Sequence, residues 1–268
     1  MCEVTSLKCE DRSTKYDEII GRITSNHKYI NSLNKSDILG KALLDYHNGN
    51  YSEDIITETN ISEPDTLPLP YLFRSYTEMP PIEQKALELC SGKVLDVGCG
   101  AGSHSLYLQE KGLDVTAIDT SEGAVEVCKK RGIQKVLNEN LLNHSGKYDT
   151  ILLLMNGTGI FEMVSRINKY LVHLKSLLND NGQIILDSSD LQYMYDTNKQ
   201  GGIWVPADRY YGELEFTMEY KGEQSAPFPW LYLDERLLQQ YCESNGLQFE
   251  VSHRGDNYNY LGVLGVVL

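Results

Sequence analysis

The chain has 268 residues, enough for one large domain or for one domain with an elaboration. Its 24 Lys and Arg stand against 38 Asp and Glu, and this net charge of −14 argues against attachment to nucleic acid or an anionic membrane through a broad basic surface. The six cysteines form no CxxC pair and no zinc-ligand spacing with histidine, so we expect reduced thiols and no metal site. The start of the chain lacks an apolar signal segment, and we expect a cytoplasmic protein.

Two helices are predicted near the N-terminus by the spacing of apolar residues, over 16–30 and, with Ser36 as N-cap, over 36–48. The segment that follows contains three prolines, and its composition predicts no regular structure through it. These prolines are Pro64, Pro68 and Pro70. We therefore expect residues 1–78 to form an N-terminal helical cap and a linker.

From residue 79 onward, helices and strands are predicted to alternate. A helix begins at Met79-Pro80-Pro81, because proline suits a first helical turn. The apolar centre of 148–155 is typical of a parallel strand covered on both faces. Such alternation requires crossover connections and predicts a doubly wound α/β sheet. The expected strands are 93–97, 113–119, 133–137, 148–155 and 183–187, and the helices between them are 103–111, 121–131 and 161–178.

The end of the chain interrupts this alternation. Polar and apolar residues alternate over 213–220, which predicts a strand with one solvent-exposed face. The segment 228–233 is predicted to be the second strand of a hairpin with it. We expect this hairpin, within residues 203–233, to be an insertion that acts as a lid, with an oligomer contact or a plain extension of the sheet as the alternatives. A helix over 234–244 and a final hairpin, 247–253 with 258–267, complete the predicted elements.

A glycine-rich turn between a strand and a helix lies at 94–105. Glycine lets a ligand approach the backbone, and the helix behind it offers unpaired N–H groups. Ser103 stands where a dinucleotide-binding GxGxxG motif needs a third glycine. Asp96, two residues before the first glycine, repels a pyrophosphate and suits a ligand with an ammonium group. Asp119 ends the next strand, 21 residues after Gly98, where a carboxylate can accept hydrogen bonds from ribose hydroxyls.

The segments DVGCGAG (96–102) and AIDTS (117–121) together resemble the class I S-adenosylmethionine-dependent methyltransferases. The resemblance covers roughly residues 80–188, and the last 35 residues by strand order. It implies S-adenosylmethionine as cofactor and a seven-stranded, Rossmann-like methyltransferase sheet over residues 79–268. The N-terminal helical cap and the β-hairpin after the fifth strand are additions to that sheet.

The resemblance also implies which residues hold the cofactor. Asp96 and the glycine turn hold its methionine part, Asp119 its ribose, and Thr120 lies beside its adenine. Asn140 stands where the family often has an aspartate that contacts the adenine amine. Packing alone remains the alternative for Cys99 and His104. The cofactor residues expected in this way, with Arg74 for a carboxylate, are Arg74, Asp96, Gly98, Cys99, Gly100, Gly102, His104, Asp119, Thr120, Asn140, Leu141, Met155 and Asn156.

In this family the substrate side lies before the first strand and after the fifth, and here both segments are rich in aromatic residues. The chain has 18 Tyr against 5 Phe and 2 Trp. If the acceptor is a hydroxyl or a protonated amine, a base is needed, and Asp190 and Tyr193 are the candidates. The expected substrate contacts are Tyr71, Phe73, Asn156, Tyr211 and Trp230.

Charge indicates the kind of acceptor. Residues 81–190 carry a net charge of −3, whereas residues 1–80 and 191–268 carry −5 and −6. We therefore expect methyl transfer by in-line displacement to a neutral or cationic small molecule, by a monomer or homodimer without membrane contact and without nucleic acid as partner. A protein or RNA methyltransferase and a non-catalytic cofactor-binding module remain open as alternatives.

Overall fold

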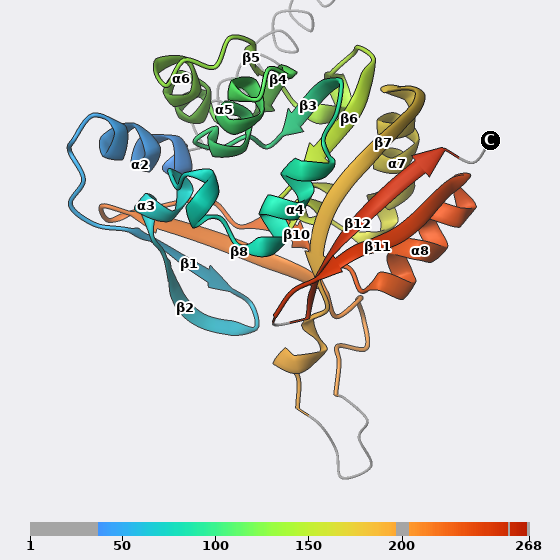
Figure 1. Cartoon of the computed structure of the whole chain (residues 1–268). Coiled ribbons are helices and arrows are strands. Elements are labelled where there is room, and N and C mark those ends of the chain that lie inside the picture. Colours follow the sequence, from blue (N-terminus) through green and yellow to red (C-terminus); the bar gives the residue numbers. More distant parts are fainter. Residues whose placement is uncertain (1–36, 197–203, 257, 267–268) are drawn as a thin grey trace, which may run out of the picture. The chain divides into compact units, whose positions relative to one another are not determined.

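A seven-stranded sheet in the order β11-β12-β7-β6-β3-β4-β5 forms the centre of the structure (Figure 1). The computed structural model describes residues 37–196, 204–256 and 258–266, so the helix predicted over 16–30 lies outside the described residues. Strands β3 to β7 pair in parallel, and β12 and β11 add two antiparallel strands. This arrangement confirms the predicted doubly wound α/β class. The strands are β3 Lys93–Val97, β4 Asp114–Asp119, β5 Val136–Asn138, β6 Tyr148–Leu153, β7 Leu178–Ser189, β11 Leu247–Arg254 and β12 Asn259–Val266.

Helices cover both faces of this sheet. Val94 of β3 packs with residues of α4 and α5, whereas its neighbour Leu95 points to the opposite face and packs with residues of α7 and α8. Successive side chains of a strand alternate between faces, so β3 is buried on both of its faces. The helices are α4 Pro81–Leu89, α5 Ser103–Glu110, α6 Glu122–Lys130, α7 Ile167–Ser176 and α8 Glu235–Ser244.

A second, antiparallel sheet has the order β10-β8-β1-β2, with β9 paired to β8. The prediction of irregular structure around Pro64 was wrong, because β2 is an edge strand on which a missing N–H costs no hydrogen bond between strands. The predicted hairpin of β8 and β10 forms, but β8 also pairs with β1, so the N-terminal cap is not purely helical. The strands are β1 Ile55–Thr59, β2 Ser62–Leu67, β8 Glu213–Tyr220, β9 Glu223–Gln224 and β10 Phe228–Leu231.

Helix α2 (Ile38–His47) joins this second sheet to the large one. Asp37, rather than the predicted Ser36, is its N-cap and accepts a hydrogen bond from the backbone N–H of Gly40. The same carboxylate accepts from Ser121 Oγ and from the backbone N–H of Gly123, at the start of α6. A β-carbon on Gly123 would lie 2.5 Å from the Cα of Gly40, so the two backbones are in direct contact. The hydrogen bonds to Asp37 and the contact with Gly40 therefore hold the start of α6, just after Asp119, against α2.

Two boundaries differ from the sequence prediction. The helix predicted over 161–178 begins only at Ile167, because Glu162 has a φ of +69° and 3₁₀ turns precede it. Residues 179–182, between the predicted helix over 161–178 and the predicted strand over 183–187, lie within β7, where the register against β6 shifts. No helix in the described ranges is long and apolar enough to cross a membrane. The remaining short elements are α3 Leu69–Leu72 and 3₁₀ turns at Tyr76–Glu78, Leu141–Asn143, Gly157–Phe161, Val164–Arg166 and Leu191–Met194.

Candidate functional site

The parallel strands β3, β4, β6 and β7 end at the same edge of the large sheet, and most of the predicted site residues lie there. Asp96 is on β3, Asp119 ends β4, and Met155 and Asn156 follow β6. In open α/β sheets, ligands bind outside the carboxyl ends of the strands. This edge is therefore the candidate site.

The glycine turn after β3 has a backbone that only glycine adopts readily. Gly98, Gly100 and Gly102 have φ values of +73°, +53° and +82°. A β-carbon on Gly102 would lie 2.3 Å from Ile133 Cδ1, so side chains behind the turn also require glycine there. A β-carbon on Gly100 would meet no atom within 4 Å, so the turn is open on that side. The turn thus offers backbone that a ligand can approach closely.

Two buried aspartates flank this turn. Asp119 Oδ2 accepts a hydrogen bond from the backbone N–H of Gly100 at 2.9 Å, and its Oδ1 accepts one from the backbone N–H of Ser121 at 2.9 Å. Asp96 accepts a hydrogen bond of 2.6 Å from Ser105 Oγ. Burial raises the pKa of both carboxyl groups above the usual range. Asp119 consequently joins the end of β4 to the glycine turn of β3.

Arg74, Glu83 and His104 form a buried group that we call the charge cluster, and Tyr71, which is 39% exposed, lies against it. The Arg74 guanidinium pairs with Glu83 Oε2, and His104 Nε2 lies 2.8 Å from the same oxygen. The guanidinium carbon of Arg74 lies 3.9 Å from the centroid of the Tyr71 ring. Burial raises the pKa of Glu83, but His104 and Arg74 outweigh it and hold that pKa below its usual value. Arg74 Nε has no hydrogen-bond partner.

Sequence reasoning named Arg74, His104 and Tyr71 but missed Glu83. A glutamate on an amphipathic helix resembles a solvated surface residue, and no signal in the sequence distinguishes it. Arg74 is itself buried, with 5% of its surface accessible.

The backbone after β6 is held in an unusual conformation by Asp187. Met155 and Asn156 have φ values of +65° and +58°, which non-glycine residues seldom adopt. Asp187 Oδ1 accepts a hydrogen bond of 2.9 Å from the backbone N–H of Gly157, and Asn156 N–H also donates to this carboxylate. Burial raises the pKa of Asp187 to about 6. Sequence reasoning missed Asp187, although an acid that follows a buried strand is the signal that identified Asp119.

The second sheet contacts this same segment through β10. The Trp230 indole lies so close to Gly159 that a β-carbon there would be 1.9 Å from Cε2. Thr158 Oγ1 donates a hydrogen bond of 3.0 Å to the carbonyl oxygen of Leu231. Ser188 Oγ accepts from the backbone N–H of Leu233 at 2.9 Å. Trp230 is therefore fixed beside the carboxyl ends of β6 and β7.

Of the other substrate-side residues, Asp190 and Tyr211 lie together. The Tyr211 hydroxyl donates to Asp190 Oδ1 at 2.8 Å, and Gln192 donates to both oxygens of this carboxylate. Tyr193 is 51% exposed and stacks on Tyr258, with ring centroids 5.4 Å apart. In the described part of the chain, no hydrogen bond joins Tyr193 to Asp190, Tyr211 or Gln192.

The remaining predicted residues have ordinary structural contacts. Phe73 packs against Tyr46 and Arg131 in the apolar cluster around α2. Cys99 Sγ lies 3.7 Å from Cys128 Sγ, and the pKa of the Cys99 thiol is raised by that contact and by burial. Thr120 is exposed, Leu141 is buried, and Asn140 is exposed and caps the following 3₁₀ turn through a hydrogen bond from Leu142.

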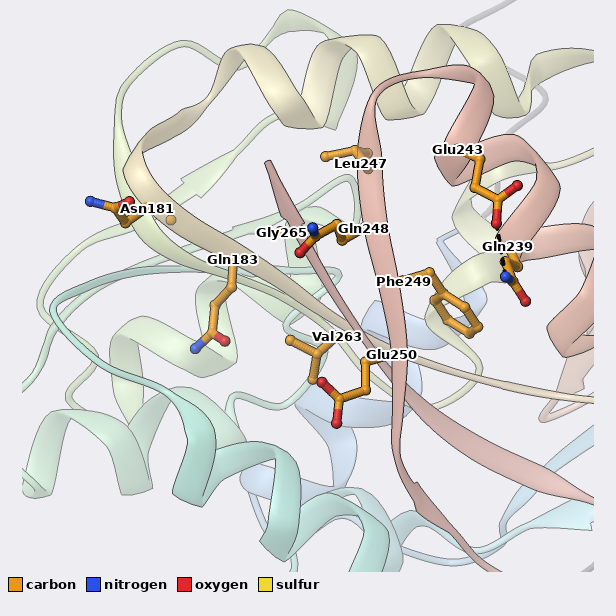
Figure 2. Close-up of a pocket in the computed structure, with 11 residues that line it drawn as sticks. Asn181, Gln183, Gln239, Glu243, Leu247, Gln248, Phe249, Glu250, Val263 and Gly265 are labelled. Atoms are coloured by element: carbon orange, nitrogen blue, oxygen red, sulfur yellow. Dashed lines mark hydrogen bonds between the residues drawn. The ribbon is translucent and has the colours of Figure 1, made fainter. Parts of the chain in front are cut away.

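Two surface hollows lie at opposite edges of the large sheet. One of about 800 Å³ is at the amino end of β7 and is lined by Gln183, Gln248 and Glu250, with Gln239 bonded to Glu243 on α8 (Figure 2). Its place, away from the carboxyl ends, sets it apart from the candidate site. The other, of about 690 Å³, lies at the carboxyl edge. Its lining residues are Asp190, Gln192, Asp234, Glu235, Arg236, Arg254, Gly255, Tyr258, Asn259 and Tyr260.

Comparison with known proteins agrees with this geometry. A family model for the methyltransferase domain matches residues 71–250, about two thirds of the chain. The chain belongs to the class I S-adenosylmethionine-dependent methyltransferases. A solved structure of an S-adenosylmethionine-dependent methyltransferase from Bacteroides fragilis, in complex with S-adenosyl-L-homocysteine, is 37% identical with a TM-score of 0.81 and covers 88% of this chain and 100% of that one. Family and neighbour identify S-adenosylmethionine as the cofactor.

Curated methyltransferases match over shorter stretches. The mitochondrial ubiquinone biosynthesis O-methyltransferase of Schizosaccharomyces pombe is 31% identical over 102 residues, 36% of this chain and 37% of that protein. The ribosomal protein L11 methyltransferase of Campylobacter fetus subsp. fetus is 32% identical over 105 residues, 37% of this chain and 36% of that protein. The chain therefore spans little more than a third of the length of these two relatives, which differ in the acceptors that their names state.

Proposed function

We propose that this methyltransferase transfers the methyl group of S-adenosylmethionine to a small molecule that is neutral or cationic, by in-line displacement. The observation that carries the proposal is the glycine turn that Asp119 holds from β4, with free space next to Gly100. A cofactor with ribose hydroxyls and an amino-acid end suits this arrangement, because the acid and the open backbone lie side by side.

The cofactor residues that we propose are those of the sequence analysis, with roles that the geometry supports. Asp119 is placed to accept from the ribose, and Asp96 lies where an ammonium group would balance a buried carboxylate. Arg74 has a buried Nε without a partner, which suits the cofactor carboxylate. Asn140 and Leu141 follow β5, on the side where the family holds adenine.

When bound, S-adenosylmethionine supplies a methyl group on a sulfonium, which is already a good leaving group. The side chains of this chain then have to align the acceptor and exclude water. Trp230 and the segment fixed by Asp187 lie where they would do this.

A base is needed only for an acceptor that must lose a proton. Asp190 and Tyr193 remain candidates from the sequence, but the Asp190 carboxylate already accepts hydrogen bonds from Tyr211 and Gln192. We add Asp187 as a third candidate. Its carboxylate also accepts a hydrogen bond, from the backbone N–H of Gly157, but burial raises its pKa to about 6, near the value at which a base works best at neutral pH.

The acidity of the acceptor side supports a cationic or neutral molecule. The hollow at the carboxyl edge is lined by three carboxylates, Asp190, Asp234 and Glu235, and by two arginines, Arg236 and Arg254, of which Arg254 is paired with Glu235. Residues 191–268 carry a net charge of −6, so a phosphate-rich acceptor would be repelled.

A labelling experiment tests this proposal. The protein is incubated with S-adenosylmethionine carrying a radioactive methyl group and a cell extract separated into small molecules, RNA and protein, and the variant Asp119→Ala serves as control. Label that enters the small-molecule fraction with the wild-type chain alone supports the proposal. Label that enters only RNA or only protein contradicts it.

A further inference from the structure

Glu83 connects three segments of the chain inside the protein. It lies on α4, while Arg74 comes from the loop after α3 and His104 from the first turn of α5. The exposed fractions of Glu83, Arg74 and His104 are 4%, 5% and 8%. Buried ion pairs add little net stability over apolar residues of the same size, because both charges lose their hydration. Stability alone therefore does not account for these buried charges.

One nitrogen of Arg74 lacks a hydrogen-bond acceptor. Two guanidinium nitrogens are used, one on the Tyr71 carbonyl oxygen and one on Glu83, but Nε is buried without an acceptor. A guanidinium N–H donates a strong, charge-assisted hydrogen bond to a carboxylate, and Nε is the nitrogen of Arg74 that has none. Next to the start of α5, where the glycine turn ends, the carboxylate at the amino-acid end of the cofactor is the ligand of matching charge.

We propose that Glu83 is a positioning residue that orients Arg74 and His104 for recognition of that amino-acid end. The inference rests on the proposed function. Glu83 is itself negative, so it acts through Arg74 and not by contact with the carboxylate. Ligands that keep the amino-acid end, such as S-adenosylhomocysteine, depend on Glu83, whereas 5′-methylthioadenosine, which lacks that end, does not.

Calorimetric titration of the full chain with these two ligands tests the inference. We expect Glu83→Gln to weaken binding of S-adenosylhomocysteine at least tenfold and binding of 5′-methylthioadenosine less than twofold. The matched control is Glu88→Gln, an exposed glutamate on the same helix that contacts Lys85 and Tyr76. It leaves both affinities unchanged.

An equal loss of affinity for both ligands overturns the inference, because a merely structural role affects the whole site. An unchanged affinity for S-adenosylhomocysteine overturns it too. If the wild-type chain binds neither ligand, the proposed function itself fails, and that outcome is distinct from the other two.

A second variant covers the case in which Glu83→Gln does not fold, since it leaves the Arg74 charge buried without its partner. The double variant Arg74→Gln/Glu83→Gln removes both charges. We expect it to lose no more affinity for S-adenosylhomocysteine than Arg74→Gln alone, because the two residues act as one unit. A further loss beyond that of Arg74→Gln, or wild-type affinity in the double variant, overturns the inference.

Discussion

The backbone N–H of Gly100 donates a hydrogen bond of 2.9 Å to Asp119 Oδ2, so the residue that ends β4 also fixes the turn that follows β3. The neighbouring backbone bonds from Gly98 and Cys99 to the carbonyl oxygen of Ile118 hold the same two strands together. A ligand that binds Asp119 is thereby presented to the glycine turn at the same time.

The first prediction concerns Asp119. Replacing it with alanine removes the acceptor that orders the Gly100 turn and the proposed partner of the ribose, so we expect affinity for S-adenosylhomocysteine to fall about 10- to 100-fold, as for the loss of one or two hydrogen bonds to a charged group. Calorimetric titration measures it. Asp114→Ala is the control, because Asp114 lies at the other end of β4 and pairs with Lys135 on the surface. A similar loss in both variants would show that β4 acts only through folding.

The sequence was sufficient for the glycine turn and for the bounds of α8, which agree with the predicted helix over 234–244. In both places local chemistry decides the structure: positive φ angles at Gly98 and Gly102 require glycine, and the Asp234 side chain accepts from the backbone N–H of Leu237. The strands β1 and β2 were not predicted. Pro64 argues against a strand in the interior of a sheet but is tolerated in an edge strand such as β2. That position is decided by tertiary pairing with β8.

In the candidate site, too, some residues follow from the local sequence and others only from tertiary packing. Asp96 and Asp119 follow directly from their places at the ends of buried strands. Asp187 carries the same signal, because it is the last residue of the predicted strand over 183–187. Glu83 was not predictable, because only packing between α4 and α5 brings its carboxylate to His104 and Arg74.

The second prediction separates two reasons for glycine at one position. Gly102 and Gly112 have similar φ angles, +82° and +86°, but a β-carbon on Gly102 would meet Ile133 and Cys128 while one on Gly112 would meet nothing within 4 Å. Gly112→Ala should cost about 1–2 kcal/mol of unfolding free energy from backbone strain alone. Gly102→Ala should cost about 1–3 kcal/mol more, because the neighbours must move. Urea unfolding compares the two, and equal losses would contradict the steric argument.

The third prediction is a pH dependence that arises from Asp187. Its pKa of about 6 in the folded chain lies above the ordinary value of 3.8. Between about pH 4 and pH 6 the folded chain keeps a proton that the unfolded chain has lost, so stability falls as the pH rises through this window. A shift of about two pKa units corresponds to roughly 3 kcal/mol.

Urea unfolding at pH 4.5 and at pH 7 tests this dependence. Asp187→Asn keeps an acceptor for the Gly157 N–H but cannot ionise, so the variant should lose less stability than the wild-type chain between these two pH values. Asp114→Asn, which changes an exposed acid, should follow the wild-type curve. An unchanged slope in Asp187→Asn would mean that this carboxyl group does not titrate in the window.

The last prediction concerns the wall that β10 forms beside the carboxyl ends of β6 and β7. Trp230 lies where a β-carbon on Gly159 would be, so Gly159→Ala must push the indole aside and toward solvent, at a cost of about 1–3 kcal/mol. The chain has 2 Trp, and the other, Trp204, is 72% exposed, so a Trp204→Phe background isolates the emission of Trp230. We expect Gly159→Ala to shift this emission to longer wavelength. Gly265→Ala, with no atom within 4 Å of the added carbon, should leave it in place. An unshifted spectrum in Gly159→Ala would show that the indole does not rest on Gly159, and Trp230 would then lose its proposed place beside the acceptor.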